Sequence, residues 1–389
     1  MTTRKLKIIN VVGARPNFMK IAPILRAIHQ HNSSPLAKEV CIESLLVHTG
    51  QHYDYEMSKV FFKDLDLPEP EIYLEIGSGT HGEQTGKVII EFEKVLFKEK
   101  PDLVIVVGDV NSTMACTLAA AKLEIPVAHV EAGLRSFDRS MPEEINRIVT
   151  DALSTFLFTP SADGDENLIK EGIAKNKIFR VGNVMVDSLL THKEKAIESK
   201  ILQTLGLQKN RPYVLLTLHR PSNVDDQESF SKIVEALTVI SKKLPVIFPV
   251  HPRTKKQIDS FGLQNIFQSM DSSSGIGNTG IYCTTPMGYL DFMKLEMSST
   301  LVMTDSGGVQ EETTALGVPC LTLRNTTERP VTVSEGTNTM VWNNTEKIIE
   351  EAFRIMNGGA RKGTIPELWD GKTAERIVNI LMEAYLNET

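Results

Sequence analysis

Residues 301–315 read LVMTDSGGVQEETTA, in which two glycines join an apolar strand to a helix-forming segment. Glycines let a backbone approach an oxyanion closely, and a helix N-terminus presents unpaired N–H donors with the positive end of its dipole. We therefore predict that Ser306, Gly307 and Gly308 bind a diphosphate. The alternative is an ordinary capped helix start, with Asp305 or Ser306 as the N-cap.

Short apolar runs alternate with longer segments of helical period on both sides of this stretch, which is typical of parallel sheets covered by helices. The pattern predicts an α/β fold with two Rossmann-like, doubly wound parallel-sheet domains that face each other across a cleft. The strands that we expect cover residues 6–13, 44–50, 102–109, 126–132 and 155–160, and then 213–220, 245–251, 280–286, 300–306 and 319–324.

The chain of 389 residues is long enough for two such domains, at ~150 residues each. A polar stretch at 208–212 interrupts the alternation. We place the N-terminal domain at 1–205 and the C-terminal domain at 206–372. The last helix, within 373–389, is expected to cross back to the N-terminal domain.

Composition excludes several classes of function. The net charge of −7 comes from well-mixed acids and bases, which argues against a nucleic-acid or anionic-membrane partner. The first apolar run ends at Gly13, too early for a signal sequence, and no run approaches the ~20 residues of a membrane span. The four cysteines lie far apart and suggest neither a disulfide framework nor a metal site. We expect a soluble, cytoplasmic protein.

Acidic residues end two of the expected strands. Asp109 and Glu131 each follow an apolar run, at the sheet edge where parallel sheets bind ligands. Two carboxyl groups in different surroundings can divide into an acid and a base. Glu143, just inside a helix start, is a third candidate. The purely structural alternatives are an N-cap role for Asp109 and a favourable interaction of Glu143 and Glu144 with the helix dipole.

Basic residues also lie at strand ends. Arg15 precedes Pro16 after the first strand, where its guanidinium could bind a phosphate, and Lys20 follows one turn later. His219 closes another strand beside Arg220, and could shuttle a proton or bind phosphate. The alternatives are a surface arginine and a structural histidine. The first loop lacks GxGxxG, which argues against NAD, and no residues have metal-ligand spacing, so we expect no cofactor and no metal.

Taken alone, these residues suit a nucleotide diphosphate whose other end is transferred or eliminated. The motifs together also resemble the non-hydrolysing UDP-N-acetylglucosamine 2-epimerases, a family of the glycosyltransferase-B architecture. In chain order these motifs are GARPNFMK, TGQH, GD followed by NST, HVEAGLRS, PEEINR, GNVMVD, TLHRPSN, HPR, TDSGGVQEE and TERP.

The resemblance implies that UDP lies mainly on the second domain, where each part of the nucleotide has its own residues. The diphosphate would bind Ser306, Gly307 and Gly308. The ribose hydroxyls would bind Glu312, and the uracil would lie beside Phe292. Arg15 and Arg329 would contact the phosphates. A homodimer is also expected.

The reaction implied by the resemblance removes the C2 proton and expels UDP, which gives a 2-acetamidoglucal intermediate. UDP adds back after reprotonation on the other face, yielding UDP-N-acetylmannosamine. Asp109, Glu131 and Glu143 would be the acids and bases, with their individual steps left open. His219 would assist at the diphosphate, and Lys20 would support the site.

Bacterial members of this family are activated by their own substrate, bound through the region after TGQH. Here that region reads TGQHYDYEM, with Asp54 and Tyr55 in place of the expected pattern. Gln51 and His52 still match the family's motif and are regulatory candidates, and whether activation is retained stays open. The competing functions are a hydrolysing epimerase, a UDP-diacetamido-glucuronate 2-epimerase, a glycosyltransferase of the same architecture and a non-catalytic nucleotide-sugar sensor.

Overall fold

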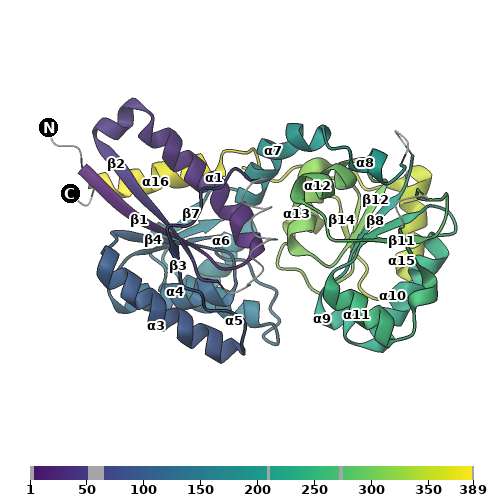
Figure 1. The fold of residues 1–389 in the computed structure, drawn as a ribbon. Coiled ribbons are helices and arrows are strands. Elements are labelled where there is room, and N and C mark those ends of the chain that lie inside the picture. Colours follow the sequence, from purple (N-terminus) through teal and green to yellow (C-terminus); the bar gives the residue numbers. More distant parts are fainter. Residues whose placement is uncertain (1–3, 51–64, 208–210, 271–274, 388–389) are drawn as a thin grey trace. The chain divides into compact units, whose positions relative to one another are not determined.

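The computed structural model describes residues 4–50, 65–207, 211–270 and 275–387. The chain divides into two compact units, each shown in Figure 1. The first unit comprises Met1–Thr191 with Glu367–Thr389, and the second comprises His192–Pro366. The domain limits expected from the sequence, after residues 205 and 372, remain predictions, as does the cleft.

The first unit contains a seven-stranded parallel sheet in the order β3-β2-β1-β4-β5-β6-β7. Its elements are β1 (Arg4–Val12), α1 (Arg15–Asn32), η1 (Pro35–Lys38), β2 (Val40–His48), β3 (Ile72–Tyr73), α3 (His81–Glu99), β4 (Leu103–Val107), α4 (Asn111–Lys122), β5 (Val127–Val130), α5 (Pro142–Leu153), β6 (Phe156–Thr159), α6 (Ala162–Lys170), η2 (Lys175–Lys177), β7 (Ile178–Arg180), α7 (Val184–Ile197), which continues into the second unit, and α16 (Thr373–Asn387).

The second unit repeats this design with a parallel sheet in the order β10-β11-β9-β8-β12-β13-β14. Its elements are α8 (Ile201–Thr204), β8 (Val214–Thr217), α9 (Pro221–Val224), α10 (Gln227–Ile240), β9 (Val246–Pro249), α11 (Pro252–Ser260), η3 (Gln264–Ile266), β10 (Phe267–Ser269), β11 (Ile281–Thr284), α12 (Tyr289–Ser298), β12 (Leu301–Thr304), α13 (Gly307–Leu316), β13 (Cys320–Thr322), α14 (Val331–Ser334), β14 (Asn338–Met340), α15 (Thr345–Arg354) and η4 (Ile355–Gly359).

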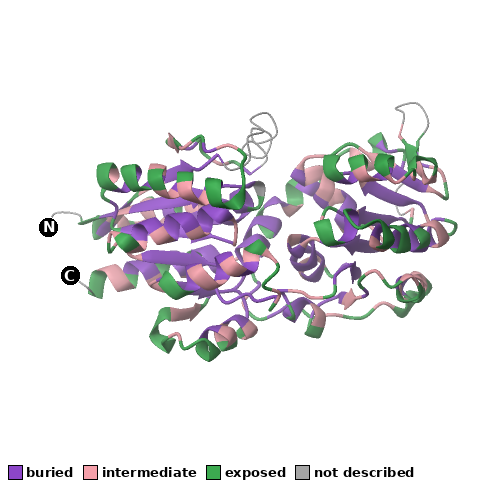
Figure 2. Cartoon of the chain, turned by 90° about the horizontal axis from the view of Figure 1, so that it is seen from below, coloured by how far each residue is buried: buried purple, intermediate pink, exposed green. Residues whose placement is uncertain are grey.

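The central strands are buried on both faces, which explains why they are continuous apolar runs rather than alternating ones. Every residue of β4 and of β12 is buried. Figure 2 shows the strands largely buried and the helices with exposed faces. The predicted fold class of two doubly wound parallel α/β domains is confirmed.

Four strands were not predicted, and all four lie at sheet edges: β3, β7, β10 and β14. Each has only two or three residues and a single neighbouring strand. An edge strand is stabilised from one side and is less buried, so its sequence carries a weak apolar signal.

The C-terminal helix α16 belongs to the first unit and packs near α1. The Asp187 carboxylate accepts hydrogen bonds from the backbone N–H groups of Thr373 (3.2 Å) and Ala374 (2.8 Å), at the first turn of α16. The Trp369 indole donates to the carbonyl of Pro160 (2.9 Å). The two bonds to Asp187 satisfy N–H groups at the helix start that would otherwise be orphaned.

Strand order reverses between β1 and β4 in one sheet, and between β8 and β12 in the other. In open α/β sheets ligands bind beyond the carboxyl ends of strands at such a switch point. The relevant chain segments are therefore those that follow β1, β4, β8 and β12. No helix in the described part of the chain is both long enough and apolar enough to cross a membrane.

Candidate functional site

A buried ion pair marks the switch point of the first unit. The Lys20 Nζ lies 2.5 Å from the Glu131 Oε2, and the two residues are only 5% and 4% exposed. Gly108, with φ +69°, makes room for this pair, because a Cβ there would lie 2.8 Å from the Lys20 Nζ. Glu131 itself has φ +74°, a left-handed conformation that costs energy and is found preferentially at functional sites.

Asn17 fixes the loop between β1 and α1. Its Oδ1 accepts hydrogen bonds from the N–H groups of Gly13 (3.1 Å) and Ala14 (3.0 Å), and its Nδ2 donates to the carbonyl of Val107 (3.0 Å). The side chain thus ties together the ends of β1 and β4. Arg15 begins α1, but its side chain lies outside the description, so its phosphate contact stays a prediction.

Asp109 does not cap a helix. The helix α4 begins at Asn111 with Val110 in the N-cap position. The Asp109 Oδ2 instead lies 2.5 Å from the Arg147 Nη1, and the Asp109 side chain is 26% exposed. The Asn146 Nδ2 donates to the Asp109 carbonyl (2.9 Å). Asp109 is therefore both oriented by protein groups and accessible to a ligand.

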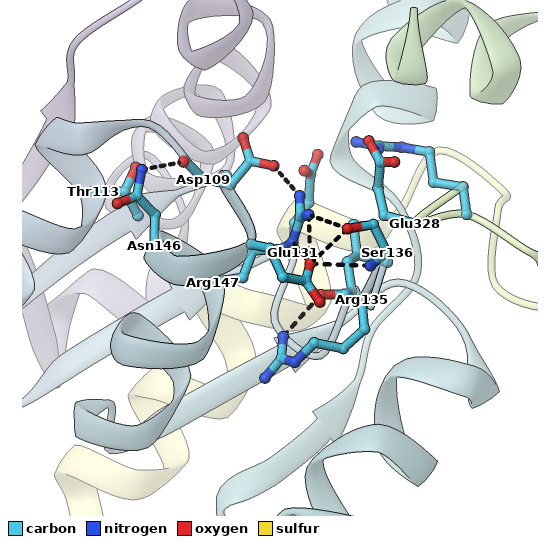
Figure 3. A network of polar contacts seen from close by, with 12 residues as sticks. Asp109, Thr113, Glu131, Arg135, Ser136, Asn146, Arg147 and Glu328 are labelled. Carbon is cyan, nitrogen blue, oxygen red and sulfur yellow. Dashed lines mark hydrogen bonds and ion pairs between the residues drawn. The ribbon is translucent and has the colours of Figure 1, made fainter. Parts of the chain in front are cut away.

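Arg147 is almost fully buried and links Asp109 to Glu144, the acid beside the predicted Glu143. Its Nη2 and Nε donate to the Glu144 Oε2 at 2.6 and 3.0 Å. Figure 3 shows Asp109, Arg147 and Ser136 converging. Burial raises the Glu144 pKa, but hydrogen bonds from Ser136 and the charge of Arg147 outweigh it and leave the pKa below its ordinary value.

Glu143, by contrast, is partly exposed in the first turn of α5. The sequence did not single out Arg147, Glu144 or Asn17. Arg147 lies in PEEINR, three residues after Glu144, which is the spacing of an ion pair on one helix face. That spacing was the available signal, but it does not reveal that the pair is buried.

A second network supports the same sheet edge. Both ring nitrogens of His129 face oxygen acceptors: the Nδ1 lies 2.6 Å from the Asp151 Oδ1, and the Nε2 lies 2.9 Å from the Gly108 carbonyl. The Asp151 Oδ2 contacts the Gly133 N–H (3.1 Å) and the Arg135 Nη1 (2.7 Å). Burial raises the Asp151 pKa, but the charges of His129 and Arg135 outweigh it and lower the pKa overall. The network ties the turn after β4 to the turn after β5.

In the second unit, the start of α13 lacks a side-chain cap. Ser306 occupies the N-cap position without a capping hydrogen bond from its side chain. The buried Asp305 carboxylate points elsewhere and accepts hydrogen bonds from the N–H groups of His219 (3.0 Å) and Arg220 (2.9 Å). The capped-helix alternative is therefore not realised by either residue, which suits an N-terminus that binds an anion.

The Arg329 side chain lies against the glycine turn at the start of α13. A Cβ on Gly307 would lie 2.5 Å from the Arg329 Nη1. Arg329 is held by Glu328 (2.6 Å) and Glu311 (2.7 Å), and Glu328 also pairs with Arg324 (2.7 Å). The TERP motif led us to predict Arg329 as a site residue, whereas Arg324, Glu311 and Glu328 were not predicted to belong to the site. The arrangement holds a guanidinium against the glycine turn.

His219 follows β8 and is 44% exposed at its side chain, with its Nδ1 3.0 Å from the Asp305 Oδ1. A carboxylate in this position orients the imidazole ring. Burial raises the pKa of Asp305, but the facing His219 outweighs it and lowers the pKa overall. Asp305, considered in the sequence only as an N-cap, thus positions His219.

Glu312 and Phe292 lie on neighbouring helices. Glu312, on α13, is buried, and its Oε1 accepts a hydrogen bond from the Tyr289 hydroxyl on α12 (3.1 Å). Phe292, on α12, is partly buried against the core of the second unit. The expected roles of Glu312 and Phe292 at the ribose and uracil stay predictions.

The two regulatory candidates, Gln51 and His52, lie outside the described residues. Just before them, the His48 Nδ1 accepts the Gly50 N–H (2.8 Å), and burial lowers the His48 pKa to about 4. Among the residues that the structure describes, no group of three histidine, cysteine or acidic side chains is arranged to hold a metal.

Comparisons with known proteins agree with this architecture. A family model described as UDP-N-acetylglucosamine 2-epimerase matches residues 35–382. A Methanocaldococcus jannaschii protein named UDP-N-acetylglucosamine 2-epimerase is 47% identical over 380 residues, covering 97% of this chain and 99% of that protein. A Pseudomonas aeruginosa UDP-2,3-diacetamido-2,3-dideoxy-D-glucuronate 2-epimerase is 42% identical over 350 residues, covering 89% and 91%.

The crystal structure of the M. jannaschii UDP-GlcNAc 2-epimerase in complex with UDP-GlcNAc and UDP is also similar, with a TM-score of 0.86 at 47% identity. The similarity covers 97% of this chain and 100% of that one. Fold and site together define an α/β enzyme with two doubly wound domains of the glycosyltransferase-B type. The chain belongs to the UDP-N-acetylglucosamine 2-epimerase family.

Proposed function

We propose that the protein reversibly converts UDP-N-acetylglucosamine into UDP-N-acetylmannosamine without net hydrolysis. The observation that carries this proposal is the pairing of an accessible carboxylate, Asp109, with the buried Arg147, beside the Lys20–Glu131 pair at the same sheet edge. Family membership adds the substrate, because the M. jannaschii relative is named for this reaction.

The chemistry requires both proton transfer and stabilisation of a leaving group. The C2–H of the sugar has no adjacent carbonyl and is weakly acidic, so its removal must accompany departure of UDP from C1. In the proposal, Asp109, Glu131 and Glu143 supply the base and the acid. The C2 proton goes to one carboxylate, the C2–H electron pair forms the C1=C2 double bond of the glucal, and the C1–O electrons leave with UDP. The return reaction protonates C2 on the other face and reforms the C1–O bond.

The nucleotide would bind to the second unit. Its diphosphate would accept hydrogen bonds from the uncapped turn at Ser306, Gly307 and Gly308, which lies beside Arg329. His219, oriented by Asp305, would assist at the departing phosphate. The remaining contacts in the proposal are Arg15 to the phosphates, Lys20 in support of the acidic residues, Glu312 to the ribose and Phe292 to the uracil.

We propose further that the enzyme works as a cytoplasmic homodimer without a cofactor and that Gln51 and His52 take part in regulation. The four cysteines all carry free thiols, which supports a reducing compartment. The homodimer rests on the resemblance to the family alone.

Incubation with two alternative donors tests the substrate. We expect UDP-N-acetylglucosamine to be converted at least about tenfold faster than UDP-2,3-diacetamido-2,3-dideoxyglucuronate, a factor that corresponds to ~1.4 kcal/mol of transition-state binding. The reason is the match to the family model and to the M. jannaschii relative. Faster turnover of the carboxylated sugar would point to the activity of the P. aeruginosa relative instead.

A further inference from the structure

Glu296 is a buried carboxyl group that the proposed reaction does not use. It is 0% exposed, and neither of its oxygens has a hydrogen-bond partner among the described residues. Buried polar atoms nearly always have a partner, and an unpaired buried carboxylate is strongly disfavoured. An acid retained in such a place therefore requires an explanation.

The position of Glu296 connects it to the proposed nucleotide site. Glu296 lies on α12 seven residues after Tyr289, which places both on one face of the helix, and both are buried. The helix α12 packs against α13, which carries Glu312. The Tyr289 hydroxyl already donates to the Glu312 Oε1 (3.1 Å). A phenol and two carboxyl groups thus share one enclosed region.

The two carboxyl groups of Glu296 and Glu312 both have raised pKa values. Burial raises the Glu296 pKa well above its ordinary value, and the neighbouring Glu312 raises it further. Burial also raises the Glu312 pKa; the Tyr289 hydrogen bond lowers it and Glu311 raises it. Two adjacent buried carboxyl groups do not both ionise, so one keeps its proton. A neutral carboxylic acid, unlike a carboxylate, has an O–H that can donate.

We propose that Glu296 is a positioning residue for ribose recognition, a protonated acid that donates to Glu312 from the protein interior when the nucleotide is bound. With Tyr289 and Glu296 both donating from within, Glu312 is held as an acceptor for the ribose hydroxyls. This inference rests on the proposed function, because it requires the ribose to lie at Glu312. It adds a residue that acts on the ligand through Glu312 and does not contact it.

Two substitutions separate this role from simple packing. Glu296→Gln is neutral, has nearly the same shape and keeps a donor. Glu296→Met is apolar, of similar length and lacks a donor, and it removes an unpartnered buried acid, so its folded state is expected to be at least as stable as that of the wild type. Glu296→Leu serves the same purpose should the Met variant fail to fold.

Calorimetric titration with UDP and with 2′,3′-dideoxy-UDP is the test. We expect Glu296→Met to weaken UDP binding by about tenfold, the effect of one lost hydrogen bond to a charged group, and Glu296→Gln to stay within about twofold of the wild type. The wild type and both variants should bind the dideoxy nucleotide equally, because it lacks the hydroxyls from which Glu312 would accept hydrogen bonds.

The outcomes also distinguish this inference from the function on which it rests. If the wild type prefers UDP over the dideoxy nucleotide but Glu296→Met binds UDP normally, the role of Glu296 is wrong while the ribose contact stands. Equal losses for both nucleotides in Glu296→Met would show a general packing effect and overturn the inference. A wild-type protein that does not bind UDP would overturn both the inference and the proposed function.

Discussion

Asp109→Asn is expected to lower the rate of C2 proton exchange by about a thousandfold, within the range for loss of an acid–base group. An amide of the same shape cannot accept a proton, so the chemical step fails. Folding should persist, because Arg147 keeps its bonds to Glu144. UDP binding should also persist, since Asp109 is not one of the proposed UDP contacts and most of these lie in the second unit. Deuterium incorporation at C2, followed by NMR, measures the exchange.

The matched control for this variant is Asp102→Asn. Asp102 immediately precedes β4, the strand that Asp109 follows, and it lies at the opposite end of that strand with an exposed side chain. The control makes the same chemical change away from the proposed site, and its exchange rate should equal that of the wild type. Wild-type exchange by Asp109→Asn itself would remove Asp109 from the catalytic residues.

Gly307→Ala should weaken UDP binding by about ten- to a hundredfold. The added Cβ would lie 2.5 Å from the Nη1 and 2.9 Å from the Cζ of Arg329, so the guanidinium must leave the turn. Charge-assisted hydrogen bonds contribute ~1.5–3 kcal/mol each, which sets this range. Calorimetric titration with UDP measures the loss.

Stability should fall as well in this variant, because moving the guanidinium disturbs its buried ion pairs with Glu328 and Glu311, although alanine favours a helix and offsets part of this cost. Gly86→Ala is the control, since Gly86 also lies in a helix but a Cβ there would meet no atom within 4 Å. Its UDP affinity should match that of the wild type. Affinity within about twofold of the wild type in Gly307→Ala would contradict a diphosphate contact at this turn.

Much of the fold follows from local sequence. Strands such as β4 and β12 are continuous apolar runs because both of their faces are covered, and such runs are visible without a structure. The strands β3 and β14 were missed because an edge strand of two or three residues depends on its single neighbour rather than on its own composition.

Sequence predicted those residues of the candidate site whose type and position in a motif are enough to indicate their chemistry. The glycine pair at Gly307 and the acids that end strands, such as Asp109, are of this kind. Arg147 and Glu144 are different. Their role depends on their burial where α5 meets the turn at Ser136, and no local sequence pattern indicates that contact. Glu296 was missed for the same reason: in sequence it reads as an ordinary helix-surface acid.

NMR of UDP-N-acetylglucosamine incubated with the protein in D₂O tests the central claim most directly. The account predicts deuterium at C2, growth of UDP-N-acetylmannosamine, and no accumulation of free UDP. Stoichiometric release of UDP with free N-acetylmannosamine would contradict it, as would an epimer that keeps its original C2 proton throughout.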